Sequence, residues 1–161
     1  MISKEEFQDK KTNFESDVVG LFGLYSSKKV KKSEIYISNF DIIENTICAT
    51  VDIELYDPNN ARLTQRKEYI NHALSGIKFT LTANHEEQYM AIDRLFLEPK
   101  ARRNKNFRIG SQTVEKIEAL AKRYGCIKIE LTAKYGSEKF WEKKGFEKTY
   151  GHNHRYIMEM L

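Results

Sequence analysis

A cluster of cations precedes a predicted helix in the second half of the chain. Residues 100–108 hold five lysines and arginines in nine positions, and Gly110-Ser111 follow at the start of a helical stretch. The first N–H groups of a helix lack intrahelical partners, and the helix dipole makes that end positive. A phosphate can therefore be held there, and a glycine lets it approach the backbone closely. The pattern predicts an anion site, and the side chains that add charge to it are Arg102, Arg103, Lys105 and Arg108.

Taken alone, the basic loop is more typical of a solvated surface, and a nucleic-acid backbone would also bind it. The histidines and cysteines offer no alternative chemistry. His152 and His154 lie two positions apart without carboxylate or cysteine partners, which is a poor basis for a metal site. Cys48 and Cys126 are interpreted as small hydrophobic residues rather than a disulfide. We therefore predict no metal.

The elements that must position the loop alternate between strand and helix. Val114, Ile117, Leu120 and Ala121 line one face of a helix that Gly125 ends. Polar turns, Pro99 and Gly145 separate the other segments. The predicted order is a strand over 78–82, a strand over 89–97, the helix, a strand over 126–132, a short helix over 137–144 and a strand over 154–160. This order predicts an α/β unit on a mixed sheet.

The first half of the chain begins with a predicted helix. Ser3 and Glu6 have the spacing of a capping box, and apolar residues then recur at helical spacing, so residues 4 to about 27 are predicted helical. Segments 33–43 and 46–56 predict a β-hairpin. Residues 61–75 are ambiguous, but their apolar positions suit a helix that ends at Gly76.

Two motifs in the second half resemble those of the GNAT superfamily of acetyl-CoA-dependent N-acetyltransferases. The first is the strand Ile92-Asp93-Arg94-Leu95-Phe96-Leu97-Glu98-Pro99, followed by the basic loop and Arg108-Ile109-Gly110-Ser111. The second is Phe140-Trp141-Glu142-Lys143-Lys144-Gly145-Phe146, which resembles the family's F-Y-E-K-x-G-F ending. The resemblance covers roughly residues 78–161. It implies an α/β (α+β) fold over a single domain, residues 1–161, with a mixed, mostly antiparallel central sheet flanked by helices.

The chain departs from the family pattern at three places. The family's loop motif is Q/R-x-x-G-x-G/A, whereas this chain has Lys105 at the first position and Arg108 at the first glycine. Many members use a tyrosine of the last helix as an acid, and Trp141 stands there, where packing is the expected role. The family also opens with a strand, whereas this chain is predicted to open with a helix.

The resemblance implies that acetyl-CoA is the cosubstrate. Its pyrophosphate would lie on the helix terminus and its pantetheine between strands 90–97 and 127–132, with the thioester carbonyl near Leu97. The residues implied in cofactor binding are Leu95, Phe96, Leu97, Arg102, Arg103, Lys105, Asn106, Phe107, Arg108, Ile109, Gly110, Ser111, Phe140 and Trp141.

The same resemblance implies direct attack by an amine in a ternary complex. An alkylamine with a pKa of about 10 is mostly protonated at neutral pH, so a base must remove a proton first. Asp93 is the first candidate and Glu130, on the neighbouring strand, is the second; an ion pair or plain exposure explains Asp93 equally well. Tyr135 or water could protonate the leaving thiolate, although an aromatic packing role suits Tyr135 better.

The composition fits a soluble globular protein. The 161 residues are 40% hydrophobic and 31% charged, which suits one domain, and no apolar run approaches the length of a membrane helix. The N-terminal residues lack the apolar core of a signal peptide, so we expect a cytoplasmic protein and no membrane partner.

Two other functions are left open. A non-catalytic GNAT-like binding module would fit the replaced glycine and tyrosine. A basic nucleic-acid-binding protein would fit the net charge of +4, but the aromatic residues fall at core-like positions, which disfavours it. The acceptor amine, small molecule or protein, is not predicted, and exposed edge strands leave a homodimer open.

Overall fold

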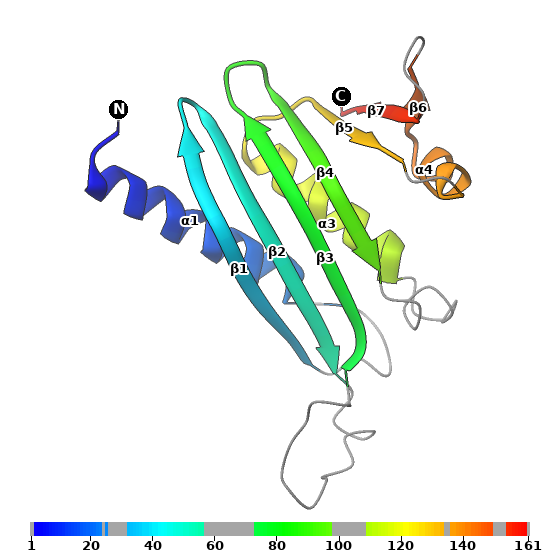
Figure 1. Ribbon diagram of the computed structural model, residues 1–161, viewed down its shortest axis with the longest axis horizontal. Coiled ribbons are helices and arrows are strands. Elements are labelled where there is room, and N and C mark those ends of the chain that lie inside the picture. The colour runs from blue at the N-terminus through cyan, green and yellow to red at the C-terminus, as the bar shows by residue number, and fades with distance from the viewer. Residues whose placement is uncertain are drawn as a thin grey trace, which may run out of the picture.

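The computed structural model describes residues 2–23, 25, 32–56, 73–97, 109–133, 136–149 and 154–160. Within them, seven strands form one sheet in the order β1-β2-β3-β4-β5-β7-β6 (Figure 1). All neighbouring strands are antiparallel except β4 and β5, which are parallel. The elements in chain order are α1 Lys4–Phe22, β1 Lys32–Ile43, β2 Thr46–Tyr56, β3 Ala73–Asn84, β4 Tyr89–Leu97, α3 Ile109–Arg123, β5 Lys128–Thr132, α4 Glu138–Lys143, β6 Glu147–Lys148 and β7 Arg155–Glu159. The predicted mixed, mostly antiparallel sheet flanked by helices is confirmed.

Helix α1 begins as predicted and ends earlier. The Ser3 hydroxyl accepts a hydrogen bond from the Glu6 N–H at 3.1 Å, which caps the first turn. The helix stops at Phe22 rather than near residue 27, and the Gly23 N–H closes it on the Val19 carbonyl. A Cβ at Gly23 would lie 2.6 Å from that carbonyl oxygen, so this ending needs glycine. In the described part of the chain no helix is long and apolar enough to cross a bilayer.

Strand β3 begins inside the segment for which a helix was predicted. Ala73, Ser75 and Gly76 lie opposite Tyr56, Leu55 and Glu54 of β2. The prediction of a helix ending at Gly76 is therefore wrong for residues 73–76, because pairing with the full length of β2 satisfies their backbone groups. Residues 61–72 lie outside the described part of the chain.

The core lies between one face of the sheet and the helices α1 and α3, which Figure 1 shows on the same side of the sheet. Phe22 of α1 packs on Phe79 of β3, with ring centroids 5.2 Å apart. Period-two alternation along the strands supplies the sheet's share of the core. Its almost fully buried side chains include Ala49, Val51, Ile53, Leu55, Ile77, Phe79, Leu81, Met90, Ile92, Ile129 and Leu131.

Helix α3 joins the parallel strands β4 and β5 and has the predicted buried face. Val114, Ile117, Leu120 and Ala121 are buried, and Gly125 follows the helix with a φ of 73°. Asp17 of α1 pairs with Arg123 at 3.1 Å at the C-terminal end of α3. The two helices are therefore held together at this end by a charged contact.

A buried hydroxyl pair joins the other end of α3 to the segment after α1. The Tyr25 and Thr113 hydroxyls lie 2.8 Å apart, and both residues are buried. Burial raises the pKa of Tyr25 well above its ordinary value, and the hydrogen bond to Thr113 lowers it by less. The neutral phenol is therefore the form that the folded protein holds.

We expect Tyr25→Phe to lower the free energy of unfolding by about 1 kcal/mol at pH 7, because the hydrogen bond is lost. The folded pKa lies above the unfolded value of about 10, so the hydroxyl stabilises the fold below about pH 10 and this contribution is lost above it. Urea unfolding at pH 7 and at about pH 10.5 should show the difference shrinking at the higher pH. An equal difference at both values would contradict this account.

Candidate active site

Strands β4 and β5 are paired over only part of their length. The parallel register runs from Tyr89 opposite Lys128 to Ile92 opposite Leu131. Strand β4 then continues to Leu97, whereas β5 ends at Thr132. Among the described residues no strand pairs with residues 93–97 on the β5 side. Their backbone groups there can therefore bind an extended ligand.

A β-bulge coincides with the point where the pairing ends. On β3, Thr80 is opposite Arg94 and Leu81 is opposite Ile92, so Asp93 is an extra residue without a partner. Such a bulge bends the strand and re-aims its side chains. Ile92 is buried and Leu95, three residues later, packs against the core, which simple alternation would not allow. Asp93, which follows the buried Ile92 and contacts Thr82, lies on the polar face of the sheet where β4 leaves β5.

The Asp93 carboxylate is exposed and held at one oxygen. The Thr82 hydroxyl donates a hydrogen bond to Asp93 Oδ2 at 2.8 Å. The described residues provide no hydrogen bond to Asp93 Oδ1. This side chain can therefore accept a proton from a molecule bound on the polar face of the sheet.

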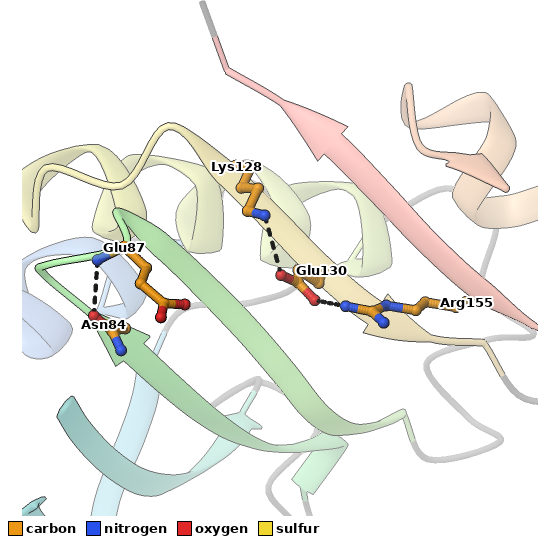
Figure 2. A network of polar contacts seen from close by, with 5 residues as sticks. All are labelled: Asn84, Glu87, Lys128, Glu130 and Arg155. Carbon is orange, nitrogen blue, oxygen red and sulfur yellow. Dashed lines mark hydrogen bonds and ion pairs between the residues drawn. The ribbon is translucent and has the colours of Figure 1, made fainter. Parts of the chain in front are cut away.

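Glu130, the second predicted base, lies in a charged network (Figure 2). Its carboxylate accepts a hydrogen bond from Arg155 of β7 and lies 3.5 Å from Lys128 Nζ. Only 14% of the Glu130 side chain is exposed. Glu130 is opposite Ala91, which lies two residues before Asp93 on β4. Glu130 is therefore in the paired part of β4 and β5, close to the point where the strands diverge. Two cations hold this carboxylate, whereas Asp93 is exposed and contacts only the Thr82 hydroxyl among the described residues.

The turn before β4 is also ordered by a polar contact drawn in Figure 2. Asn84 Oδ1 accepts a hydrogen bond from the Glu87 N–H at 2.9 Å, which closes the turn between β3 and β4. Because β3 and β4 pair from Asn84 and Tyr89 onward, this turn sets their register. The register in turn decides which β3 side chain faces Asp93.

The N-terminus of α3 carries the predicted anion site only in part within the described residues. The helix begins at Ile109, with Gly110 and Ser111 in its first turn, and no acidic residue occurs in that turn. The first N–H groups of a helix lack partners within the helix, and no acidic side chain in this turn opposes an anion there. The predicted ligands Arg102, Arg103, Lys105, Asn106, Phe107 and Arg108, and the predicted acid Tyr135, lie outside the described residues. For Phe96, Leu97 and Ile109 the structure describes only the backbone.

A comparison of the chain with models of protein families identifies the family to which it belongs. A model of the acetyltransferase (GNAT) family matches residues 34–146, which is more than half of the chain. The chain belongs to the GNAT acetyltransferase family. It is thus an acetyltransferase, and the match extends the likeness from the second half of the chain back over β1 and β2.

A comparison of this chain with curated proteins finds no significant match. Among solved structures, the chain is similar to a putative N-acetyltransferase from Lactobacillus plantarum, with 15% identity, a TM-score of 0.47 and coverage of 99% of this chain and 94% of the other. It is also similar to Tetrahymena GCN5, with 10% identity, a TM-score of 0.46 and coverage of 70% and 69%. A third is the PaiA N-acetyltransferase from Thermoplasma acidophilum in complex with coenzyme A, with 18% identity, a TM-score of 0.44 and coverage of 69% and 60%.

In this GNAT chain the aromatic residues of α4 belong to the core. Trp141 is 6% exposed, and its ring lies 5.0 Å from that of Phe140 and 5.3 Å from that of Phe146 in edge-on contacts. Phe140 is partly buried against the same cluster. This packing supports a structural role for Trp141, which stands where many GNAT members have a tyrosine.

Three polar contacts in the fold were not predicted from the sequence. Thr82 contacts Asp93, Arg155 contacts Glu130, and His154 Nδ1 lies 3.3 Å from Glu138 Oε1. Glu138 also accepts a hydrogen bond from the Gly136 N–H, and hydrogen bonds from backbone N–H groups lower its pKa. Each pair joins residues on different segments. Only strand register could have revealed the first two contacts.

Proposed function

We propose that this protein transfers the acetyl group of acetyl-CoA to a primary amine by direct attack within a ternary complex. The observation that carries the proposal is the end of β4–β5 pairing at Ile92, next to an exposed carboxylate at the bulge. Membership of the GNAT family supports acetyl-CoA as the acyl donor. Acetyl-CoA is a substrate in this scheme, as is the amine.

The unpaired stretch of β4 would bind the donor. N–H and C=O groups of residues 93–97 can pair with the amide groups of an extended pantetheine, as a strand would. A backbone N–H near Leu97 would donate to the thioester carbonyl and stabilise the oxyanion that develops there. Gly110 and Ser111 would hold the pyrophosphate at the start of α3, with the arginines and lysines of residues 102–108 adding charge.

Asp93 would serve as the general base. The amine arrives mostly as an ammonium ion, and Asp93 Oδ1 would take one proton from it, directly or through a water molecule. The neutral nitrogen then attacks the thioester carbonyl carbon, a C–N bond forms, and the C–S bond breaks. The nitrogen loses its second proton as the amide forms, and that proton balances the one that the thiolate gains. Tyr135 or water would supply a proton to the departing thiolate, which needs little help because thiols have a pKa of about 8.5.

Calorimetric titration of acetyl-CoA tests the donor site. We expect micromolar binding by the wild-type protein and at least about tenfold weaker binding by Lys105→Glu/Arg108→Glu, because two favourable charges on the phosphates become repulsive. Lys4→Glu/Lys148→Glu makes the same change in net charge at exposed positions on α1 and β6 and should bind normally. Absence of binding by the folded wild-type protein would refute the proposal.

Release of free thiol from acetyl-CoA, measured with a panel of primary amines, separates catalysis from binding alone. Amine-dependent release is expected from an acetyltransferase. Binding without release across the panel would favour a non-catalytic module instead, which the replacement of the loop glycine by Arg108 would suit.

A further inference from the structure

Thr82 lies diagonally across the β3–β4 ladder from Asp93. The backbone partner of Thr82 is Ala91, and the bulge brings Asp93 within 2.8 Å of the Thr82 hydroxyl. An ionised carboxylate only accepts hydrogen bonds, so Thr82 is the donor. The bond engages Oδ2 and leaves Oδ1 without a hydrogen bond from the described residues. The two carboxylate oxygens of Asp93 are therefore not equivalent.

A third side chain extends this contact to β2. Cys48 Sγ lies 3.9 Å from Thr82 Oγ1. A hydroxyl has one hydrogen, and that of Thr82 is directed to Asp93, so the Cys48 thiol must donate in this contact. The result is a directed chain from thiol to hydroxyl to carboxylate across three strands. A thiol is a weak donor, so the Thr82 hydroxyl makes the main contribution.

We propose that Thr82 is a positioning residue that holds the Asp93 carboxylate for proton transfer, an inference that rests on the proposed function. An exposed aspartate samples several rotamers, whereas a general base must meet its proton at hydrogen-bond distance. Anchoring Oδ2 on β3, which is paired on both sides, restricts the side chain and directs Oδ1 toward the bound amine. Thr82 itself exchanges no proton with the substrate.

The same strand provides a matched control. Thr80 lies two residues from Thr82 on the same face, is also partly buried, and its hydroxyl pairs with that of Thr50 at 3.2 Å. Thr80→Val and Thr82→Val therefore remove the same atom from neighbouring positions of one strand. Only Thr82→Val removes a hydrogen bond to Asp93.

The experiment measures thiol release from acetyl-CoA with two small nucleophiles, butylamine and hydroxylamine, after subtraction of the rate without protein. Butylamine is mostly protonated at neutral pH and needs a base, whereas hydroxylamine is a weaker base and attacks mainly as the neutral molecule. We expect Thr82→Val to lower kcat with butylamine about tenfold and kcat with hydroxylamine less than about threefold. The KM for acetyl-CoA should not change. Thr82→Ser should stay within about twofold of wild type and Thr80→Val should match wild type.

An equal loss with both nucleophiles, or no recovery in Thr82→Ser, would assign Thr82 a purely structural role and overturn the inference. If the wild-type protein does not turn over butylamine, another amine of the panel that it accepts takes the place of butylamine. Absence of thiol release by the wild-type protein with every amine of the panel would instead refute the proposed function, and the inference with it. Acetyl-CoA binding by calorimetry verifies that each variant is folded. If Thr82→Val fails that check, Thr82→Ala takes its place. Thr82→Ala also removes the hydroxyl but introduces a smaller side chain, and its rates are compared with those of Thr82→Ser.

Discussion

An Asp93→Asn variant is expected to acetylate butylamine at least about 100-fold more slowly than the wild-type protein. Asparagine has the same shape, and its side-chain oxygen can still accept the hydrogen bond from Thr82, so the local structure should be retained. It cannot take a proton from an ammonium ion. The loss should therefore appear in kcat, while the KM for acetyl-CoA stays unchanged. Initial rates of thiol release at saturating acetyl-CoA provide the measurement.

Asp52→Asn is the matched control for this variant. Asp52 is also a carboxylate on the polar face of the sheet, on β2, where it lies 4.0 Å from Lys78 Nζ. It lies on β2, two strands away from β4, and makes no contact with Asp93, so the variant should keep wild-type turnover. Retention of more than about a tenth of the activity in Asp93→Asn would show that the base is another group. Glu130 would then be tested next, by Glu130→Gln.

Trp141→Ala is expected to have the largest effect on stability, lowering the free energy of unfolding by about 3–5 kcal/mol. The indole is 6% exposed and packs edge-on against Phe140 and Phe146, so truncation leaves a cavity that the short helix α4 cannot fill. Guanidinium-induced unfolding followed by circular dichroism measures the loss, since the variant removes the only tryptophan.

Phe140→Ala provides the comparison for Trp141→Ala. Phe140 lies on the same helix but is only partly buried, so its truncation should cost clearly less. Trp141→Phe should recover most of the stability, because an aromatic ring is kept in the same place. A Trp141→Ala variant of wild-type stability with weakened acetyl-CoA binding would contradict the packing role and support the contact with acetyl-CoA that the family resemblance implies.

Features that depend on residues close together in the sequence were predictable from the sequence alone. The hairpin of β1 and β2 and the buried face of α3 follow from side-chain periodicity. The end of α3 follows from Gly125, whose positive φ suits glycine. The basic loop before Gly110 could be recognised as a candidate anion site because its lysines and arginines and the glycine are contiguous in the sequence. Asp93 could be proposed because it lies on the strand that leads into this loop.

Other features depended on the register between strands, which local patterns do not encode. The bulge at Asp93 arises from how β4 fits against β3, and it decides that Asp93 faces Thr82. The engagement of Glu130 by Arg155 likewise requires the pairing of β5 with β7, from segments 25 residues apart. Residues 73–76 adopt a strand for the same reason, because β2 offers them hydrogen-bond partners. Strand pairing acts between distant segments, so only the folded sheet distinguishes the exposed Asp93 carboxylate from the Glu130 carboxylate, which two cations hold.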